Sequence, residues 1–288
     1  MNNDYILNWR TADPEAKYGL PAKKFTGVHA SVSFCLGGLL TALFYLALYP
    51  IWRLQTFPMV NMFFHGGDAE RSTIPYYTMF LTFWCLAFIL IKWCKIAVQK
   101  RAFQIAILPD NVDFVLSPDT SAQVLRRIRE QVYMPEAFLV FNRIQKALSN
   151  LKNIGRVSDV SSVLNDLATA DEKFLEATYT LPRGLIWAIP VTGFIGTVLG
   201  LSKAVGGFGR VVAGGADIET LKNALSGVTG GLAVAFETTL IALVAALLVQ
   251  LLLTMLMQKE EELLDECATY CHENVVARLK LLDMKDDL

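Results

Sequence analysis

The sequence predicts an all-α membrane protein with about four transmembrane helices and a helical domain between the second and the third of them. The chain is 53% hydrophobic and only 18% charged, whereas soluble domains carry about 25% charged residues. Its apolar residues are also gathered into discrete runs that are long enough to cross a bilayer. The formal net charge of −1 leaves no general basic surface, so we expect no nucleic-acid partner.

The first two spans are predicted within residues 30–97. They follow a polar segment, 1–29, that lacks the apolar core of a signal peptide. Residues 30–52 contain no charge, and Gly37-Gly38 would allow close contact with another helix. A second apolar run covers 74–91, and its helical pattern continues for several residues beyond. These two spans are joined by a short loop that we place on the outer side.

Residues 98–182 have the composition of a soluble domain, and we expect them to form a helical cytoplasmic domain. Three helix starts are predicted, at Ser117-Pro118-Asp119, at Pro135-Glu136 and at Ser158. These residues cap a helix or fit into its first turn. The segment shows neither the alternation of a strand nor the turn signal of a hairpin.

The third and fourth spans are predicted within residues 183–258. The run 184–202 is uncharged, and the run 223–258 contains one charged residue, Glu237. The second run would form about 54 Å of helix, which exceeds the ~30 Å of a bilayer core. We therefore expect helices three and four to extend into the cytoplasm, where a charged helix at 259–288 follows. Basic residues are concentrated at the N-terminus, in 98–182 and in the tail, so both termini are predicted to be cytoplasmic.

The third span carries a proline and a run of regularly spaced glycines. In Ile-Pro-Val-Thr-Gly-Phe-Ile-Gly-Thr-Val-Leu-Gly-Leu, residues 189–201, Pro190 would kink the helix. The glycines follow at steps of three and four and leave one helix face nearly bare, so another helix can pack closely. With the glycine pair of the fourth span, the predicted close-packing residues are Gly193, Gly196, Gly200, Gly230 and Gly231.

Hydroxyl residues occur on both of these spans at membrane depth. If the two helices form an antiparallel pair, Thr197 and Thr239 can lie at a similar depth, which suits a pathway lined by hydroxyls. Thr192 and Thr238 are further candidates for this pathway. The alternative is that each hydroxyl bonds to its own helix and that the glycines serve packing alone.

The run 189–201 and the later run Gly-Leu-Ala-Val-Ala-Phe-Glu-Thr-Thr-Leu-Ile-Ala-Leu-Val-Ala-Ala-Leu resemble the MotA/TolQ/ExbB proton channel family. The resemblance covers about residues 182–260. It implies a homopentamer in the bacterial inner membrane around a single-span partner of the MotB/TolR/ExbD type, whose membrane aspartate carries the proton. By motif, the pore-facing threonines of the family correspond to Thr197 and Thr239, and its kink proline corresponds to Pro190.

The same resemblance implies that ion flow turns the pentamer about its partner. No cofactor and no metal are expected, and the transported ion would be a proton or sodium. The predicted spans contain no aspartate, as suits a subunit that takes its titrating carboxylate from a partner. Two spans before the cytoplasmic domain resemble the flagellar stators, whereas the segment around Pro190 resembles ExbB and TolQ. The driven process therefore stays open among flagellar rotation, outer-membrane transport, gliding and phage defence.

Charged residues suggest two further sites. Glu237 lies at membrane depth, where a charge is costly, and a lysine at position 203 could reach it. We predict an intramembrane charge pair of Lys203 and Glu237 that is structural or gates the mouth, with proton relay as the alternative. A cluster on one cytoplasmic helix could transmit force, although a solvated helix face is the favoured explanation: Arg126, Arg127, Arg129 and Glu130.

Three other classes of protein are alternatives to a channel subunit. A passive membrane scaffold would explain the glycine faces but not the hydroxyls, and a secondary transporter usually shows internal repeats. A membrane enzyme is disfavoured because the chain has no H-E-x-x-H, no G-x-S-x-G and no phosphate-binding loop. Cys267, Cys271 and His272 supply too few ligands for a four-ligand zinc site, so we assign these residues to helix packing.

Overall fold

The structure is a computed structural model that describes residues 5–20, 22–55, 57–64, 73–105, 107, 116–149, 157–215 and 217–279. The chain divides into two compact units, each assembled from separate stretches of sequence. The first, here called the polar unit, takes the described parts of 1–32, 90–180 and 255–288. The second, here called the membrane unit, takes the described parts of 33–89 and 181–254.

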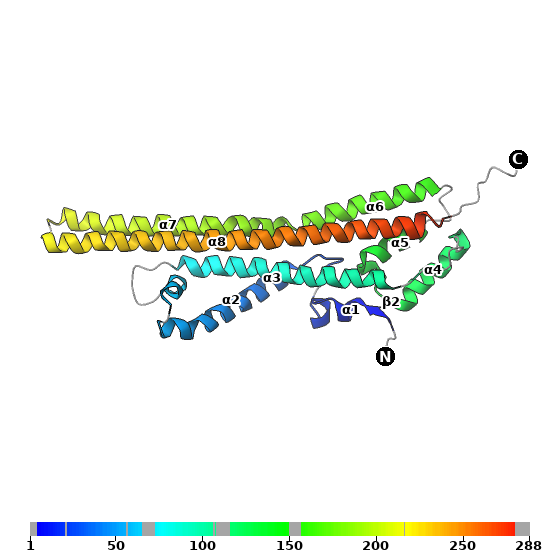
Figure 1. Ribbon diagram of the computed structural model, residues 1–288, viewed down its shortest axis with the longest axis horizontal. Helices are drawn as coiled ribbons and strands as arrows, with labels where there is room; N and C mark the ends of the chain where they lie inside the picture. Colours follow the sequence, from blue (N-terminus) through cyan, green and yellow to red (C-terminus); the bar gives the residue numbers. More distant parts are fainter. Residues whose placement is uncertain are drawn as a thin grey trace. The chain divides into compact units, whose positions relative to one another are not determined.

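Four helices in the described residues are long and apolar enough to cross a membrane, which confirms the predicted all-α membrane fold (Figure 1). They are α2 (Ala30–Arg53), α3 (Ile74–Arg101), α7 (Thr180–Ala213) and α8 (Ile218–Cys271). A 3₁₀ helix, η2 (Pro58–Phe63), lies between α2 and α3. The chain is thus a multi-pass membrane protein whose spans follow the apolar runs of its sequence.

The ends of α7 and α8 differ from the prediction. The third span was expected to end near residue 202, yet α7 continues through Lys203 to Ala213. Gly206, Gly207 and Gly209, which follow the predicted end of the span, therefore lie inside the helix. Glycine weakens a helix by about 1 kcal/mol relative to alanine but does not end it, and here α7 runs beside α8 (Figure 1).

The last helix is also longer than predicted at both ends. It begins at Ile218 instead of near residue 223, because the Asp217 carboxylate accepts hydrogen bonds from the hydroxyl and the backbone N–H of Thr220. These bonds, led by the one from the hydroxyl, hold the pKa of Asp217 below its ordinary value. At the other end, α8 runs into the region where a separate C-terminal helix was expected, and a π-helical turn, η6 (His272–Val276), follows it directly.

Close helix packing organises the membrane unit. The backbone of α3 at Trp84 lies so near Gly37 that a Cβ on this glycine would be 2.5 Å from the Trp84 Cα atom. Ser33 accepts a hydrogen bond of 3.2 Å from the Trp84 indole nitrogen. A second core joins α7 and α8, where Ile189 packs against Ala242. Small residues and aromatic rings therefore set how closely these spans approach.

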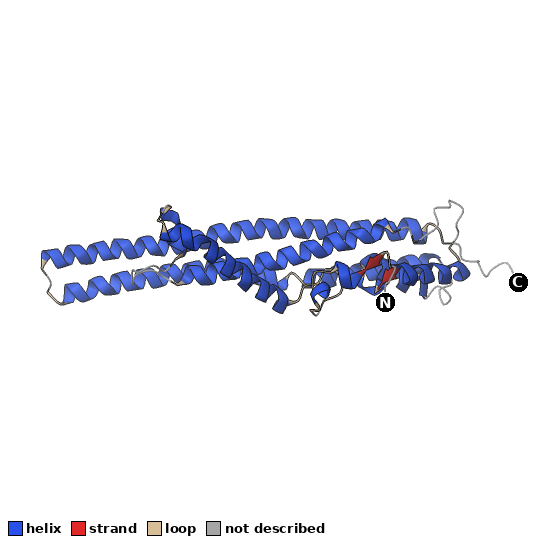
Figure 2. Ribbon diagram, turned by 90° about the horizontal axis from the view of Figure 1, so that it is seen from below, coloured by secondary structure: helices blue, strands red, loops and turns tan. Residues whose placement is uncertain are grey.

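The polar unit is built mainly from short helices, which Figure 2 shows beside a small pair of strands. Its helices and 3₁₀ turns are α1 (Trp9–Ala12), η1 (Ala16–Tyr18), η3 (Ala102–Gln104), α4 (Pro118–Gln131), η4 (Pro135–Ala137), α5 (Leu139–Ser149) and α6 (Val157–Ala177). Strand β1 (Leu7–Asn8) pairs in parallel with β2 (Val132–Tyr133). Two residues per strand are too few to produce an alternating pattern, so this pairing could not be predicted.

One of the three predicted helix starts is observed as expected, and the other two are shifted. Ser117 caps α4 as expected, with the capping box closed by Thr120. The Pro135 start opens a 3₁₀ turn, and the α-helix proper begins at Leu139. The third helix begins at Val157, one residue before the predicted cap at Ser158.

Candidate functional site

Helices α7 and α8 form an antiparallel pair at glycine-lined contacts within the membrane unit. A Cβ on Gly196 would lie 2.5 Å from the Thr238 hydroxyl oxygen, and a Cβ on Gly200 would lie 2.9 Å from the Ala235 Cβ. The predicted close packing at Gly193 and Gly231 is also present, against Ala242 and Ala204 respectively, whereas Gly230 is half-buried on α8. Any side chain at the tight positions would push the helices apart.

The hydroxyls of Thr197 and Thr239 are in contact across this helix pair. Each also bonds to a backbone carbonyl of the other helix: Thr197 donates to Ala235 at 3.1 Å, and Thr239 donates to Gly193 at 3.1 Å. Bonds to their own helices are longer, at 3.4 Å for Thr197 and 3.5 Å for Thr239. Both side chains are half-buried. Their hydroxyls form a polar position in a helix contact made mostly by apolar residues.

The other two predicted threonines differ in position. Thr192 lies with its hydroxyl 3.1 Å from that of Thr78 on α3. Thr238 is buried in the α7–α8 contact beside Gly196 and donates at 2.8 Å to the carbonyl of Ala235, which also accepts from Thr197. Thr78 was missed, although it and Thr82 stand four residues apart in the second apolar run, a spacing that places both on one helix face.

Residues 135–269 match the model of the MotA/TolQ/ExbB proton channel family. Over this segment, just under half of its length, the chain is similar to the channel region of that family. The matched segment contains Pro190, which lies within an uninterrupted α7, and both members of the Thr197–Thr239 pair. Comparison with curated proteins and with solved structures gives no match.

This match indicates the general kind of activity. Proteins of the MotA/TolQ/ExbB family are subunits of ion-channel energisers and stators and are not enzymes. The hydroxyl pair therefore does not need to perform covalent chemistry. In such a subunit, it can offer hydrogen bonds to a proton carrier or coordinate an ion inside an apolar wall.

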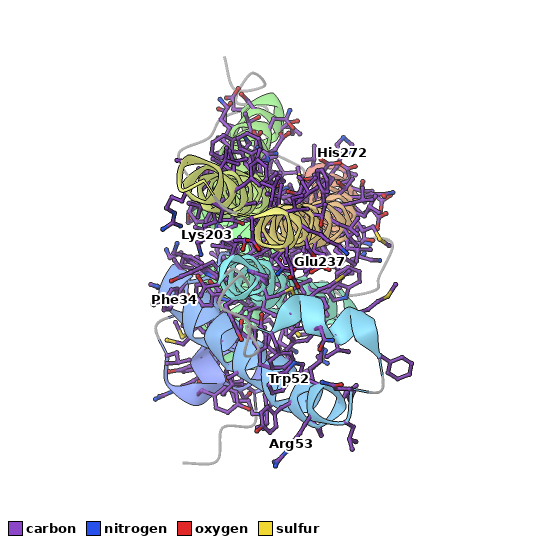
Figure 3. All side chains as sticks on the ribbon, turned by 90° about the vertical axis from the view of Figure 1, so that its left-hand side faces the viewer. Phe34, Trp52, Arg53, Lys203, Glu237 and His272 are labelled. Carbon is purple, nitrogen blue, oxygen red and sulfur yellow. The ribbon has the colours of Figure 1, made fainter. Side chains whose placement is uncertain are left out.

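Lys203 and Glu237 do not form the predicted ion pair. Among the described residues, no ion pair within 4.0 Å includes either of them. Contacts at Thr197–Thr239 and at Ala204–Gly231 fix the register of the helices, which leaves Lys203 about five residues, or ~7.5 Å along the axis, from the level of Glu237. Figure 3 shows the two labelled residues on separate helices.

The charged cluster on α4 lies on an exposed helix face. Arg126 and Glu130 form an ion pair with a nitrogen–oxygen distance of 2.8 Å, one helical turn apart. Arg127 and Arg129 are exposed as well. The four residues thus share the solvated face that was the alternative to a force-transmitting surface, and that second role stays a prediction.

A buried charged network in the polar unit was missed by the sequence analysis. Lys95 on α3 lies 2.6 Å from the Glu15 carboxylate and 3.1 Å from that of Asp13. It also donates to the carbonyl of Gly27 at 2.8 Å. All three charged side chains are at most 1% exposed, so two buried carboxylates compensate one buried cation.

The same network continues one helical turn earlier on α3. Lys92 lies 3.1 Å from the Glu260 carboxylate, donates to the Thr178 hydroxyl at 2.6 Å and lies 4.0 Å from the centre of the Tyr179 ring. Thr26 donates a hydrogen bond to Glu260. The sequence did contain a signal for this network, because Lys92 and Lys95 lie in the helical extension of an apolar run. Lysines that are buried require partners.

The cysteines near the end of α8 are packed inside the polar unit. Cys267 and Cys271 are both buried, and Arg143 lies near them with its guanidinium paired to Asp171 at 2.8 Å. The part of the chain that the structure describes contains no cluster of three or more His, Cys, Asp or Glu side chains arranged to hold a metal ion.

Proposed function

We propose that this chain is the pore-forming subunit of an ion-driven membrane motor, with the proton as its ion. It assembles as a homopentamer around a single-span partner like MotB, ExbD or TolR and converts ion flow into rotation or force. The observation that carries the proposal is the contact between Thr197 and Thr239 across the glycine-packed α7–α8 pair. In the pentamer, five such threonine pairs around a partner helix would form a ring of hydroxyls.

The distribution of carboxylates supports a pore-forming subunit whose partner carries the proton. The runs 30–52, 74–91, 184–202 and 223–258 contain no aspartate, and a carboxylate in the membrane is costly unless it has a function. Glu237 is the one acidic side chain in these runs, and among the described residues it is not a hydrogen-bond partner of Thr197 or Thr239. The proton-carrying carboxylate is therefore supplied by the partner, and the threonines give it hydrogen bonds at a defined depth.

The proposed location is the bacterial inner membrane, with both termini in the cytoplasm. Lysine and arginine are concentrated in the N-terminal segment, in 98–182 and in the tail, and such segments remain on the cytoplasmic side. In this orientation the polar unit is the cytoplasmic domain. Its α4 cluster is then available to act on whatever the motor drives.

The first test combines native mass with ion flux. We expect the complex purified with its partner to have the mass of five copies of this chain plus the partner helices. In vesicles, Thr197→Val and Thr239→Val should each abolish most of the partner-dependent proton flux, because valine keeps the shape of threonine and removes the hydroxyl. Thr197→Ser, which restores a hydroxyl, should recover flux.

Thr254→Val provides the matched control. Thr254 is an exposed threonine of α8 whose hydroxyl bonds to its own helix at Gln250, so its loss should leave flux unchanged. A monomer that ignores the partner, or full flux in both valine variants, would contradict the proposal. The chain would then be a passive scaffold or a subunit of a secondary transporter.

A further inference from the structure

Helices α7 and α8 each carry one charged residue inside a long uncharged stretch. Residues 184–209 contain a single charge, Lys203, and residues 223–258 contain a single charge, Glu237. Both residues belong to the membrane unit and to helices that are long and apolar enough to span a bilayer. A charge in such a stretch is costly unless an opposite charge compensates it, and it usually marks a functional contact.

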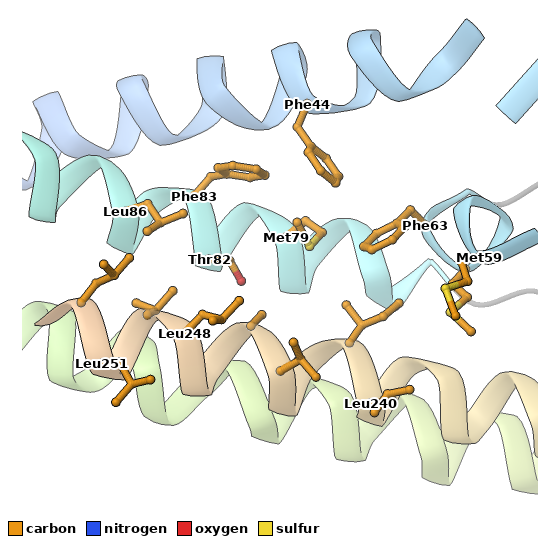
Figure 4. A pocket seen from close by; sticks show the side chains of 16 residues that line it. Phe44, Met59, Phe63, Met79, Thr82, Phe83, Leu86, Leu240, Leu248 and Leu251 are labelled. Carbon is orange, nitrogen blue, oxygen red and sulfur yellow. The ribbon is translucent and has the colours of Figure 1, made fainter. Parts of the chain in front are cut away.

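Neither charge is compensated within the described part of the chain. No ion pair between described residues includes Lys203 or Glu237. Lys203 is exposed and Glu237 is half-buried. One helical turn from Glu237, Leu240 and Ile241 line a pocket with α2 and α3, and this lining contains no charged side chain (Figure 4). A partner for either charge must therefore come from outside the described residues.

The packing of α7 against α8 keeps the two charges apart in one copy. Ala235 and Thr239 of α8 both contact α7. Glu237 is two residues from each of them, which places it about 160–200° around the helix. It therefore lies on the face of α8 that is turned away from α7, in addition to its axial separation from Lys203.

A second copy of the chain can compensate both charges at once. The face of α8 that carries Glu237 would lie against α7 of the next copy, where Lys203 supplies the opposite charge. Different surfaces of the two copies meet in such a contact, so it is head-to-tail and can close into a ring. In a closed ring every lysine at this position and every glutamate has a partner.

The two side chains are long enough to meet in such a ring. Copies around an axis normal to the membrane lie at equal depth, so Lys203 stays ~7.5 Å along the axis from the neighbouring Glu237. Bonds of about 1.5 Å carry the lysine nitrogen roughly 6 Å and the glutamate oxygen roughly 5 Å from their Cα atoms. Their combined reach exceeds the offset and suits helices packed about 8–10 Å apart.

The other possible neighbours of this face do not match its charge. In the proposed motor the partner helix lies against Thr197 and Thr239, and Thr239 is on the opposite side of α8 from Glu237. Lipid tails carry no charge at all. Phe236 and Leu240 beside the carboxylate are more than half exposed, so the face combines apolar area with one negative charge.

We propose that Lys203 of one copy forms an ion pair with Glu237 of the next copy and thereby joins α7 of one subunit to α8 of its neighbour. This inference rests on the homo-oligomer of the proposed function. It adds the two side chains that hold adjacent copies together within the membrane.

The test is charge reversal, measured as the native mass of the complex purified in detergent, with the partner co-expressed where the chain has one. Lys203→Glu and Glu237→Lys should each convert most of the oligomer into smaller species, because like charges then meet at every contact. The double variant with both reversals should recover the wild-type mass.

Co-expression of the two single variants distinguishes a pair between copies from a pair within one copy. Where a Lys203→Glu copy adjoins a Glu237→Lys copy, opposite charges meet in either order. Mixed oligomers that contain both variants should therefore form, and different affinity tags on the two variants allow their isolation. Within one copy each single variant still has two like charges, so an internal pair would gain nothing from mixing.

Arg210→Glu is the matched control. Arg210 is an exposed cation of the same helix whose Nε atom donates to the carbonyl of Gly206, one turn away, at 3.3 Å. Reversal of this charge should leave the native mass unchanged.

Two results would overturn the inference and leave the proposed function intact. One is an unchanged native mass in both single variants. The other is recovery in the double variant without any mixed oligomer from the co-expressed single variants. A wild-type chain that is monomeric would overturn the proposed function together with this inference.

Discussion

Two ion pairs of the polar unit differ mainly in their exposure to water. Arg143 and Asp171 meet at 2.8 Å with side chains 2% and 8% exposed, whereas Arg126 and Glu130 meet at the same distance with side chains 82% and 59% exposed. Removing one partner of a buried pair leaves a charge without compensation and costs about 3–5 kcal/mol. An exposed pair one turn apart contributes only about 0.3–0.5 kcal/mol.

We therefore predict that Asp171→Ala lowers the melting temperature of the purified protein strongly and that Glu130→Ala barely changes it. Thermal unfolding in one detergent measures both. Replacing the whole buried pair, as Arg143→Met with Asp171→Leu, should recover much of the loss because no charge is then left buried. Equal melting temperatures for Asp171→Ala and Glu130→Ala would show that the buried guanidinium finds another partner.

The sequence identified some of these residues and not others, for a physical reason. Thr197 and Thr239 could be matched because both stand in apolar spans and a helix has a fixed rise, so their depth follows from counting. The predicted pairing of Lys203 with Glu237 is not formed, because the register of the two helices leaves these residues ~7.5 Å apart along the axis. The partners of Lys92 and Lys95 come from distant parts of the chain, and no local pattern indicates them.

At the scale of elements, the crossing of α2 and α3 depends on the difference between two adjacent glycines. A Cβ on Gly37 would lie 2.5 Å from the Trp84 Cα, whereas a Cβ on Gly38 would only touch the ring of Phe80 at 3.8 Å. Backbone atoms cannot move aside as a flexible side chain can. The two positions therefore form a natural pair for testing how closely these helices must pack.

We predict that Gly37→Ala separates α2 from α3 and destabilises the protein by about 1–3 kcal/mol, as overpacking does. Gly38→Ala should be neutral or slightly stabilising, since alanine favours a helix more than glycine. Thermal unfolding reports the stability, and Trp84 fluorescence reports the loss of its bond to Ser33. Identical behaviour of the two variants would mean that the crossing can adjust.

The sequence predicted that the four long helices exist, but it did not predict where they begin and end. Each of the four apolar runs became a spanning helix, because a bilayer forces an apolar run to satisfy its own backbone bonds. The ends depend on what a helix meets beyond the run. Contact with α8 carries α7 past Lys203, and the Asp217 cap starts α8 earlier than the apolar pattern does.

At the scale of the whole molecule, the N-terminal segment is part of the folded polar unit. Its Asp13 and Glu15 compensate Lys95 in a buried site. We predict that Lys95→Met, which leaves two carboxylates buried side by side, releases this segment, while the triple variant with Asp13→Asn and Glu15→Gln restores it. The rate of tryptic cleavage after the exposed Lys17 measures the release.

Lys100→Met is the control for that experiment. Lys100 lies on the same helix and pairs with Glu266, but both side chains are well exposed, at 39% and 49%, so cleavage after Lys17 should stay slow. Fast cleavage in the triple variant as well would show that the segment is held by the charge on Lys95 itself and not by the absence of uncompensated carboxylates.

The interleaving of the two units sets an order of events during synthesis. Lys92 emerges from the ribosome 168 residues before Glu260, which at ~5–20 residues per second is a delay of roughly 10–30 s. During that time α3 is complete, yet one of its lysines has no carboxylate partner. A nascent chain that stops before residue 260 therefore lacks the carboxylate that pairs with Lys92 in the finished protein.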